Sequence, residues 1–336
     1  MDETNAKVAL IRADRRRGGV AEAMALVDAD LRRALSDEPH PLLIPAMDRR
    51  AQAHPDVLSA LADSVLAGGA SEFTVSSVDP RYQAELWGRP AKFTTADILS
   101  SDADWSTISW SGPGGDPGEL RIPAAAASCR CRIVVGLAGA HKVFRLALGL
   151  ASLAALVHPA DRGFVGGGGG IGPLRGPLVR GWLAMRSISG GMRPTGPERR
   201  RLAEVGRATR ALAALASHAS PSFSVVDAFD AGQGTIVAGA DPVAVDAVAA
   251  AALGFDPMEI GHLRMAHSLG LGVADLSRIT LVGDALVRPR PRLRRDPADR
   301  LLRLAATAPM AATLAPPRPH FATVPQSEGS RDAHRV

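Results

Sequence analysis

Polar residues at the ends of predicted strands are the best candidates for acid–base chemistry in this sequence. His141 and Lys142 come directly after CRIVVGLAG (131–139), the clearest buried strand of the chain. A histidine in that place can act as a general base, and a lysine can bind an anion. The pair can equally well begin the next segment as surface residues, so both interpretations stay open. We predict a catalytic role for the pair.

Two aspartates follow another predicted strand, SFSVVDAFD (222–230). Asp227 and Asp230 lie near its carboxyl end, where carboxylates suit metal binding or proton transfer. The alternative for Asp227 is a cap on the neighbouring backbone. We predict that Asp227 is catalytic, that Asp230 binds substrate, and that neither belongs to a metal site.

A third carboxylate, Asp246, interrupts the apolar stretch PVAVDAVAAAALG (242–254). Asp241 suits the N-cap of a helix and Gly254 suits its C-terminal end. A helix that is apolar on nearly every side is buried, and a buried carboxylate needs hydrogen-bond donors or its pKa rises. The structural explanation is that Asp246 accepts from backbone N–H groups or an arginine. The functional explanation, and our prediction, is a catalytic role in a cleft shared with the other strand-end residues.

The remaining histidines and the glycine run are weaker candidates. His158, in LVHPAD (156–161), either faces the same cleft as a substrate-binding residue or ends a helix at the surface. His262 and His267 are five residues apart on a predicted helix and do not share a face, so we predict no zinc site. The glycine run 166–170 lacks the Lys of a phosphate-binding Walker loop, and a lid over the cleft is favoured.

The elements that must position these residues alternate between strands and helices. This alternation predicts an α/β fold, with a mainly parallel central sheet flanked by helices and a Gly/Pro-rich helical insertion. We expect one α/β domain over 1–285, with the insertion at about 146–218, and a largely disordered Pro/Arg-rich tail over 286–336. Strands are predicted at 7–14, 40–47, 71–79, 131–139, 222–230 and 277–284, and helices at 19–35, 54–70, 146–157, 197–218 and 242–254.

Charge and cysteine content narrow the classes of partner and cofactor. The formal net charge is +5, but no nucleic-acid-binding motif accompanies the basic segments, so we expect a small-molecule ligand and no specific nucleic acid.

The apolar run 146–157 is too short to span a bilayer, so no membrane span is predicted. Cys129 and Cys131, the only cysteines, are predicted to lie in one strand. They cannot supply the four thiolates of an iron–sulfur cluster, and a reduced cytoplasmic location is expected. A homo-oligomer is left open.

Two stretches of the sequence resemble a known family. VVDAFDAGQGTIVAGADPVAVDAVAAAALGFDP (225–257) and HSLGLGVADLSRITLVGD (267–284) resemble the uncharacterised bacterial and archaeal family named domain of unknown function 362. The resemblance implies an α/β protein, and it makes His54 a candidate substrate-binding residue. Some members carry ferredoxin-like iron–sulfur modules, from which a redox association has been inferred, and this chain has no such module.

The chain also departs from the family's pattern. Ile44-Pro45-Ala46 stands where Lys-Pro-Asn is usual, and an apolar run follows His141 and Lys142 where a basic segment is usual. Two functions therefore stay open. The first is an enzyme that modifies a small molecule by proton transfer, elimination or a redox-linked step, in a cleft at the carboxyl ends of the strands. The second is a catalytically degenerate relative that binds a ligand or partner without turnover.

Overall fold

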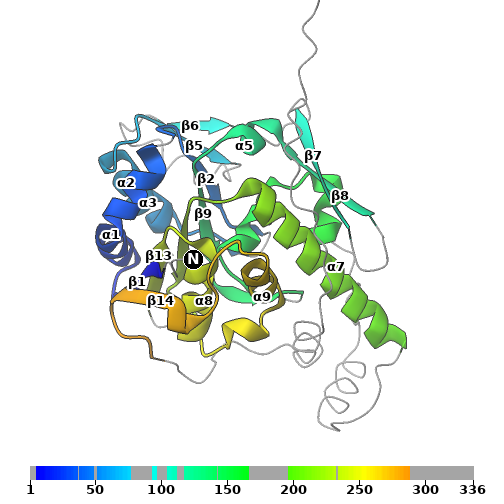
Figure 1. Cartoon of the computed structure of the whole chain (residues 1–336). Helices are drawn as coiled ribbons and strands as arrows, with labels where there is room; N and C mark the ends of the chain where they lie inside the picture. The colour runs from blue at the N-terminus through cyan, green and yellow to red at the C-terminus, as the bar shows by residue number, and fades with distance from the viewer. Residues whose placement is uncertain are drawn as a thin grey trace, which may run out of the picture.

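A twisted eight-stranded sheet with helices on both faces forms the centre of the molecule (Figure 1). In this computed structural model, the described residues are 5–36, 38–48, 51–76, 93–96, 104–111, 117–141, 143–165, 196–231 and 234–287. The predicted tail from 288 onward, the glycine run 166–170 and Lys142 lie outside these ranges.

The sheet is mainly parallel, as the alternation of strands and helices predicts. Within this eight-stranded sheet, β13 alone runs antiparallel to its neighbours, β1 and β12. The order across the sheet is β14 (Ile279–Gly283), β1 (Ala6–Arg12), β13 (Thr235–Gly239), β12 (Phe223–Ala228), β9 (Arg132–Leu137), β2 (Leu42–Pro45), β5 (Phe73–Ser76) and β6 (Phe93–Ala96).

The direction of the chain across the sheet reverses between β2 and β9. From β2 the chain moves outward to β5 and β6, whereas from β9 it moves the other way to β12 and β13. The helical segments that follow these two strands accordingly lie on opposite faces. Such a reversal is the topological switch point of an open α/β sheet.

Side chains alternate between the two faces of each strand, so each face has its own core. In β1, Ala9 and Ile11 pack on the face that we call the α1 face, and Val8 and Leu10 pack on the opposite one, the α8 face. The α1 face is covered by α1 (Arg16–Leu26), α2 (Asp28–Ser36) and α3 (Pro55–Ala67). The α8 face is covered by α7 (Gly196–Ala219), α8 (Pro242–Ala252), α9 (Gly261–Ser268) and the 3-10 helix η1 (Leu150–Leu156).

Short elements extend from the edges of the sheet. Three hairpins are β3 (Met47–Asp48) with β4 (Ala51–Gln52), β7 (Trp105–Ser111) with β8 (Pro117–Pro123), and β10 (Gly139–His141) with β11 (Arg145–Ala147). The other short helices are α5 (Ala124–Ser128), η2 (Pro159–Val165), η3 (Pro257–Glu259) and η4 (Leu276–Arg278). Within the described residues, no helix combines the length and the apolar character that crossing a bilayer requires.

Two of the predicted helices need correction. The predicted helix 19–35 is two helices separated at Val27, because Asp28 and Asp30 begin a new first turn, where acidic side chains are favourable. The run 146–157 is buried as expected, but it is not one α-helix. Its first residues belong to β11, and Leu150–Leu156 forms the 3-10 helix η1.

The two cysteines do not lie within one strand, as the sequence suggested. Cys129 directly follows α5 and Cys131 directly precedes β9, so both cysteines lie in the connection between this helix and this strand. Neither forms a disulfide, and Cys129 Sγ donates a hydrogen bond to the Cys131 carbonyl oxygen at 3.2 Å.

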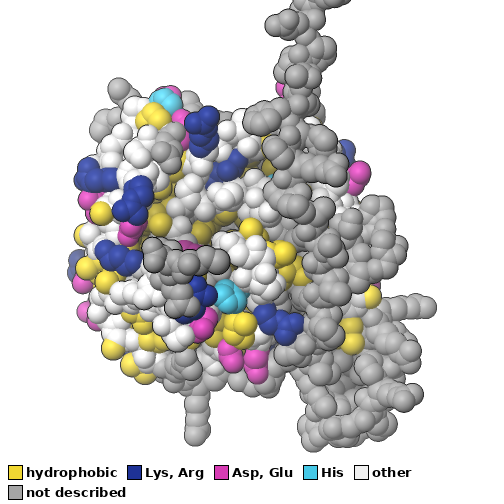
Figure 2. Space-filling model, viewed as in Figure 1, with side chains coloured by type: hydrophobic (Ala, Val, Ile, Leu, Met, Phe, Trp, Pro, Cys, Tyr) yellow, Lys and Arg dark blue, Asp and Glu magenta, His cyan; other side chains and the backbone are white. Residues whose placement is uncertain are grey.

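Charged side chains are mixed over the face shown in Figure 2, where Lys and Arg side chains over α1 and α2 are interspersed with acidic ones. Several of them form exposed ion pairs, which contribute little stability each. The pairs are Arg17 with Asp63, Arg32 with Asp28, and Arg33 with Asp30.

Two glycines allow the start of η1 to lie directly on the sheet. A Cβ atom on Gly136 of β9 would stand 2.5 Å from the backbone nitrogen of Gly149. A Cβ atom on Gly149 would stand 2.5 Å from Ser224 Oγ and 2.8 Å from Asp246 Oδ1. A side chain at Gly136 would require the backbone to move, and one at Gly149 would displace the side chains of Ser224 and Asp246.

We expect Gly136→Ala to destabilise the protein by about 2–3 kcal/mol or more, because the new methyl group meets backbone atoms that cannot move independently. Gly139→Ala is the matched control, since no atom lies within 4 Å of its Cβ position. Urea unfolding of both variants provides the measurement. Equal stability of the two would contradict the close backbone contact.

Candidate functional site

The loops after β2 and β9 meet the conditions for a ligand site in this type of fold. In open α/β sheets, ligands bind outside the carboxyl ends of the strands at the switch point. His141 ends the first strand of the β10–β11 hairpin, directly after β9. His54 follows β2 and the small β3–β4 hairpin. Two of the predicted site histidines therefore belong to the two loops that border the switch point.

The ring of His141 is held by its own turn. Its Nδ1 accepts hydrogen bonds from the backbone N–H groups of Val143 at 3.2 Å and Phe144 at 3.1 Å. A neutral imidazole whose Nδ1 is an acceptor carries its proton on Nε2. The geometry therefore makes Nε2 a hydrogen-bond donor, which favours stabilisation of negative charge over the general-base role suggested by the sequence.

An aromatic side chain links His141 to a second histidine. The ring of Phe144 stacks on that of His141, with centroids 4.8 Å apart and planes inclined by 15°. His262, from α9, meets Phe144 edge to face at 5.3 Å. His262 is 1% exposed, and burial, with a smaller contribution from nearby His141, lowers its pKa to about 3. It is therefore neutral throughout the physiological range.

The next residue of the hairpin combines backbone strain with a buried charge. Arg145 has a φ of 71°, a left-handed conformation that is unfavourable for a side chain of this size. Its buried guanidinium lies 2.9 Å from Glu259 Oε2 and 5.0 Å from the centroid of Phe255. Strain and buried polar groups together are typical of functional sites. We call His141, Phe144, Arg145, Glu259 and His262 the hairpin cluster.

Three polar members of the hairpin cluster were missed at the level of sequence. Arg145 stands in an apolar run, and Glu259 lies in a short turn before α9. We weighed His262 only as a partner of His267 in a metal site. The available signal was its place between the apolar residues Ile260 and Leu263, which indicates a buried histidine.

Asp246 is fully buried on α8 and accepts two backbone hydrogen bonds. Gly149 N–H donates to its Oδ1 at 2.7 Å, and Leu150 N–H donates to its Oδ2 at 2.9 Å. These are the first amides of η1, so the carboxylate caps that 3-10 helix and joins it to α8. Burial raises the pKa of Asp246 to about 7, although both backbone donors oppose the shift.

Asp227 is also fully buried, but it faces the other side of the sheet. Its Oδ1 accepts from the N–H of Phe229 at 3.0 Å. Its Oδ2 lies 3.0 Å from Arg16 Nε, close enough for an ion pair but not aligned for a hydrogen bond. Burial raises the pKa of Asp227, while Phe229 N–H and Arg16 oppose the rise. Asp230, whose side chain is 80% exposed, accepts from the same arginine at 2.6 Å.

The structure does not bring these two buried carboxylates together. Ser224 and Val226 of β12 face Gly149 and the α8 face, so the alternation along the strand turns Asp227 toward α1. The sheet therefore separates Asp227 from Asp246, and one cleft cannot contain both side chains. The shared cleft that the sequence suggested for them is wrong for this pair.

The other two predicted histidines serve as local caps. Nδ1 of His54 accepts from Asp56 N–H at 3.2 Å and caps α3. Nδ1 of His158 accepts from Ala160 N–H at 3.2 Å, and its ring meets Trp105 edge to face at 4.5 Å. Both precede a proline, which suits the first position of a helix. Lys142 lies outside the described residues.

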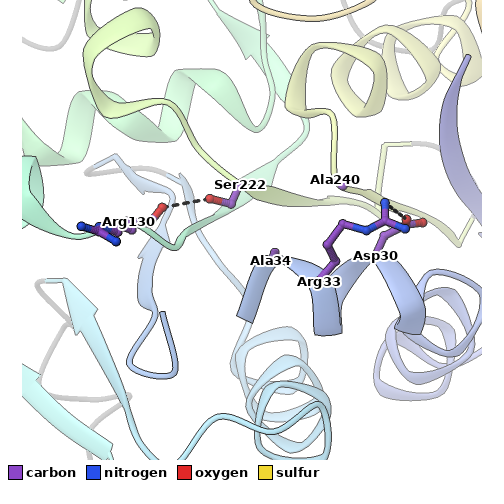
Figure 3. Close-up of a pocket in the computed structure, with 6 residues that line it drawn as sticks. All are labelled: Asp30, Arg33, Ala34, Arg130, Ser222 and Ala240. Carbon is purple, nitrogen blue, oxygen red and sulfur yellow. Dashed lines mark hydrogen bonds and ion pairs between the residues drawn. The ribbon is translucent and has the colours of Figure 1, made fainter. Parts of the chain in front are cut away.

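A pocket of ≈ 380 Å³ opens at the opposite ends of the central strands, where β9 and β12 begin (Figure 3). Arg33 pairs with Asp30 there at 3.5 Å, and the Ser222 hydroxyl donates to the Arg130 carbonyl oxygen at 3.1 Å. None of the predicted site residues lines it. Its lining residues are Asp30, Arg33, Ala34, Arg130, Ser222 and Ala240.

Metal ligands do not cluster in the part of the chain that the structure describes. No three side chains of His, Cys, Asp or Glu in those ranges are arranged to hold one ion.

Comparison with known proteins gives little further information. No family model matches the chain, and no curated protein matches it. One solved structure with some similarity is the lactate racemase apoprotein from Thermoanaerobacterium thermosaccharolyticum, with 15% identity and a TM-score of 0.39. The match covers 72% of this chain and 56% of that one, so it spans little more than half of the racemase chain. Similarity at this level does not establish a shared activity, and membership of the family of unknown function 362 stays a prediction.

We expect Asp246→Asn to cost about 1–3 kcal/mol of stability, because an amide NH₂ group cannot accept from the second backbone N–H. The cost depends on pH. The pKa of Asp246 is about 7 when folded against a reference of 3.8, so the folded state retains a proton that the unfolded state has lost between these values. The contribution of Asp246 is therefore complete below about pH 4 and declines as the pH rises to about 7.

Urea unfolding of wild type and variant at about pH 5 and about pH 8 measures this dependence. The difference in stability between them should be larger at the lower pH, because asparagine does not titrate. A difference that is the same at both values would show that the folded protein keeps Asp246 ionised.

Proposed function

We propose that the chain is an enzyme that acts on a small molecule at the carboxyl ends of β2 and β9, with His141 as a hydrogen-bond donor to the negative charge that develops on the substrate. The observation that supports this most strongly is the place of His141, on the turn directly after β9 at the switch point of the sheet. Ligands in open α/β folds bind at this point.

The hydrogen bonds of His141 suggest the type of step. With Nδ1 occupied by two backbone donors, Nε2 presents an N–H group. Such a group can donate a hydrogen bond to the negative charge that develops on a carbonyl oxygen when a neighbouring carbon loses its proton, or on a leaving oxygen in an elimination. Proton transfer and elimination therefore fit better than a redox step. Lys142, the next residue, would bind an anionic part of the substrate.

The surroundings of His141 would keep its ring in one orientation. Two backbone N–H groups hold Nδ1, and stacking on Phe144 defines the plane of the ring. The strained residue Arg145 lies at the other end of this turn, where it forms an ion pair with Glu259 of η3. A donor that is oriented before the substrate binds needs no reorganisation during the reaction.

One observation favours the alternative, a protein that binds a ligand without turnover. The two buried carboxylates that we expected to take part in catalysis are already committed, Asp246 to backbone amides and Asp227 to Arg16 and Phe229. A proton-transfer enzyme would then need its base from elsewhere in the chain. The two functions differ in whether substrate protons exchange with solvent.

Incubation of the protein in D₂O with a pooled library of small carbonyl and hydroxy compounds provides the test. We expect deuterium incorporation into one class of compound, detected by mass spectrometry. His141→Gln should reduce its rate by about 100-fold or more, the usual loss when a hydrogen-bond donor to a developing oxyanion is removed. His218→Gln is the control, since His218 lies near the end of α7 outside the candidate site.

Deuterium incorporation at the same rate in His141→Gln would exclude His141 as the hydrogen-bond donor of the reaction. No exchange by wild type in any compound that binds would instead support the binding protein.

A further inference from the structure

His262 differs from the other histidines near the sheet because neither of its ring nitrogens has a hydrogen-bond partner among the described residues. It is 1% exposed, so bulk water does not satisfy them either. By contrast, His54, His141 and His158 each accept a backbone N–H at Nδ1, and Nδ1 of His267 bonds to the turn at 272–274.

A buried polar group without a partner is destabilising, and such groups are few in folded proteins. Apolar side chains of similar size would fill this position on α9 at no such cost. Phe144, which touches His262, also stacks on His141. The unsatisfied imidazole of His262 is therefore separated from His141 by one aromatic side chain, that of Phe144.

We infer that His262 is a specificity residue of the proposed site, where its imidazole receives a neutral ligand group that both donates and accepts hydrogen bonds, such as a carboxamide or a hydroxyl. This inference rests on the proposed position of the ligand beside His141. A neutral imidazole presents one N–H donor and one nitrogen acceptor, and such a group complements both. Burial keeps the pKa of His262 near 3, so the ring does not become the cation that would attract a carboxylate.

Acetamide and acetate form a matched pair of probes, since they have nearly the same shape but differ in charge and in donors. We would record the imidazole ¹⁵N resonances of histidine-labelled protein during titration with each. Acetamide should shift the His262 resonances in a saturable manner, and acetate should not. His262→Phe should weaken the binding of acetamide about tenfold, followed through the His141 resonances.

A stability measurement separates this role from a purely structural one. His262→Phe should raise the melting temperature, because two unsatisfied polar atoms are removed. His267→Phe, on the same helix, should lower it, because a bonded imidazole is lost. His262→Leu provides a second apolar variant if phenylalanine does not fit.

His262 resonances that respond to neither probe, or equally to both, would overturn the inference. So would a fall in melting temperature for both apolar variants of His262, since that would indicate a structural partner. The proposed function is judged separately by deuterium exchange in His141→Gln. If that exchange depends on His141 while His262 ignores both probes, the proposed function stands and only the role of His262 fails.

Discussion

The contact between the Asp246 carboxylate and the first amides of η1 determines how the chain leaves the central sheet. Gly149 and Leu150 donate to its two oxygens, and Gly136 allows the same segment to lie on β9. The β10–β11 hairpin is the piece of chain between β9 and this anchor. With both of its ends attached to the core, the turn that contains His141 has little freedom to move.

Attachment on both sides also helps to explain how strain at Arg145 can persist. A left-handed backbone at a large residue is maintained only where the surrounding structure requires it. Here β11 pairs with β10, and the guanidinium is bonded to Glu259 and covers Phe255. The hairpin cluster thus places two buried polar side chains, Arg145 and His262, beside the half-buried His141 and Glu259. Such an arrangement is difficult to justify by stability alone, and it is the main reason to place function there.

The two buried carboxylates lie on opposite faces of the sheet, and each stabilises a different part of the fold. Asp246 organises the α8 face, where it joins a helix to the chain after β9. Asp227 organises the α1 face, where Arg16 links the start of α1 to the end of β12 and lies 4.7 Å from the ring of Phe229. Each uses a carboxylate to satisfy donors that would otherwise be buried without a partner. The side chains that remain as candidates for a functional role are therefore the histidines His141 and His262.

Local pattern in the sequence determined the α/β class, most strand positions, the burial of α8 and its cap at Asp241, because these depend on neighbours along the chain. It also made His141 a candidate site residue, because a polar residue after a buried strand can be recognised without knowledge of its neighbours in space. Only the tertiary structure decided which face each carboxylate occupies, since that depends on strand alternation and on contacts with Arg16 and Gly149. The unsatisfied ring of His262 was likewise beyond the sequence, because hydrogen-bond satisfaction is a property of the folded surroundings.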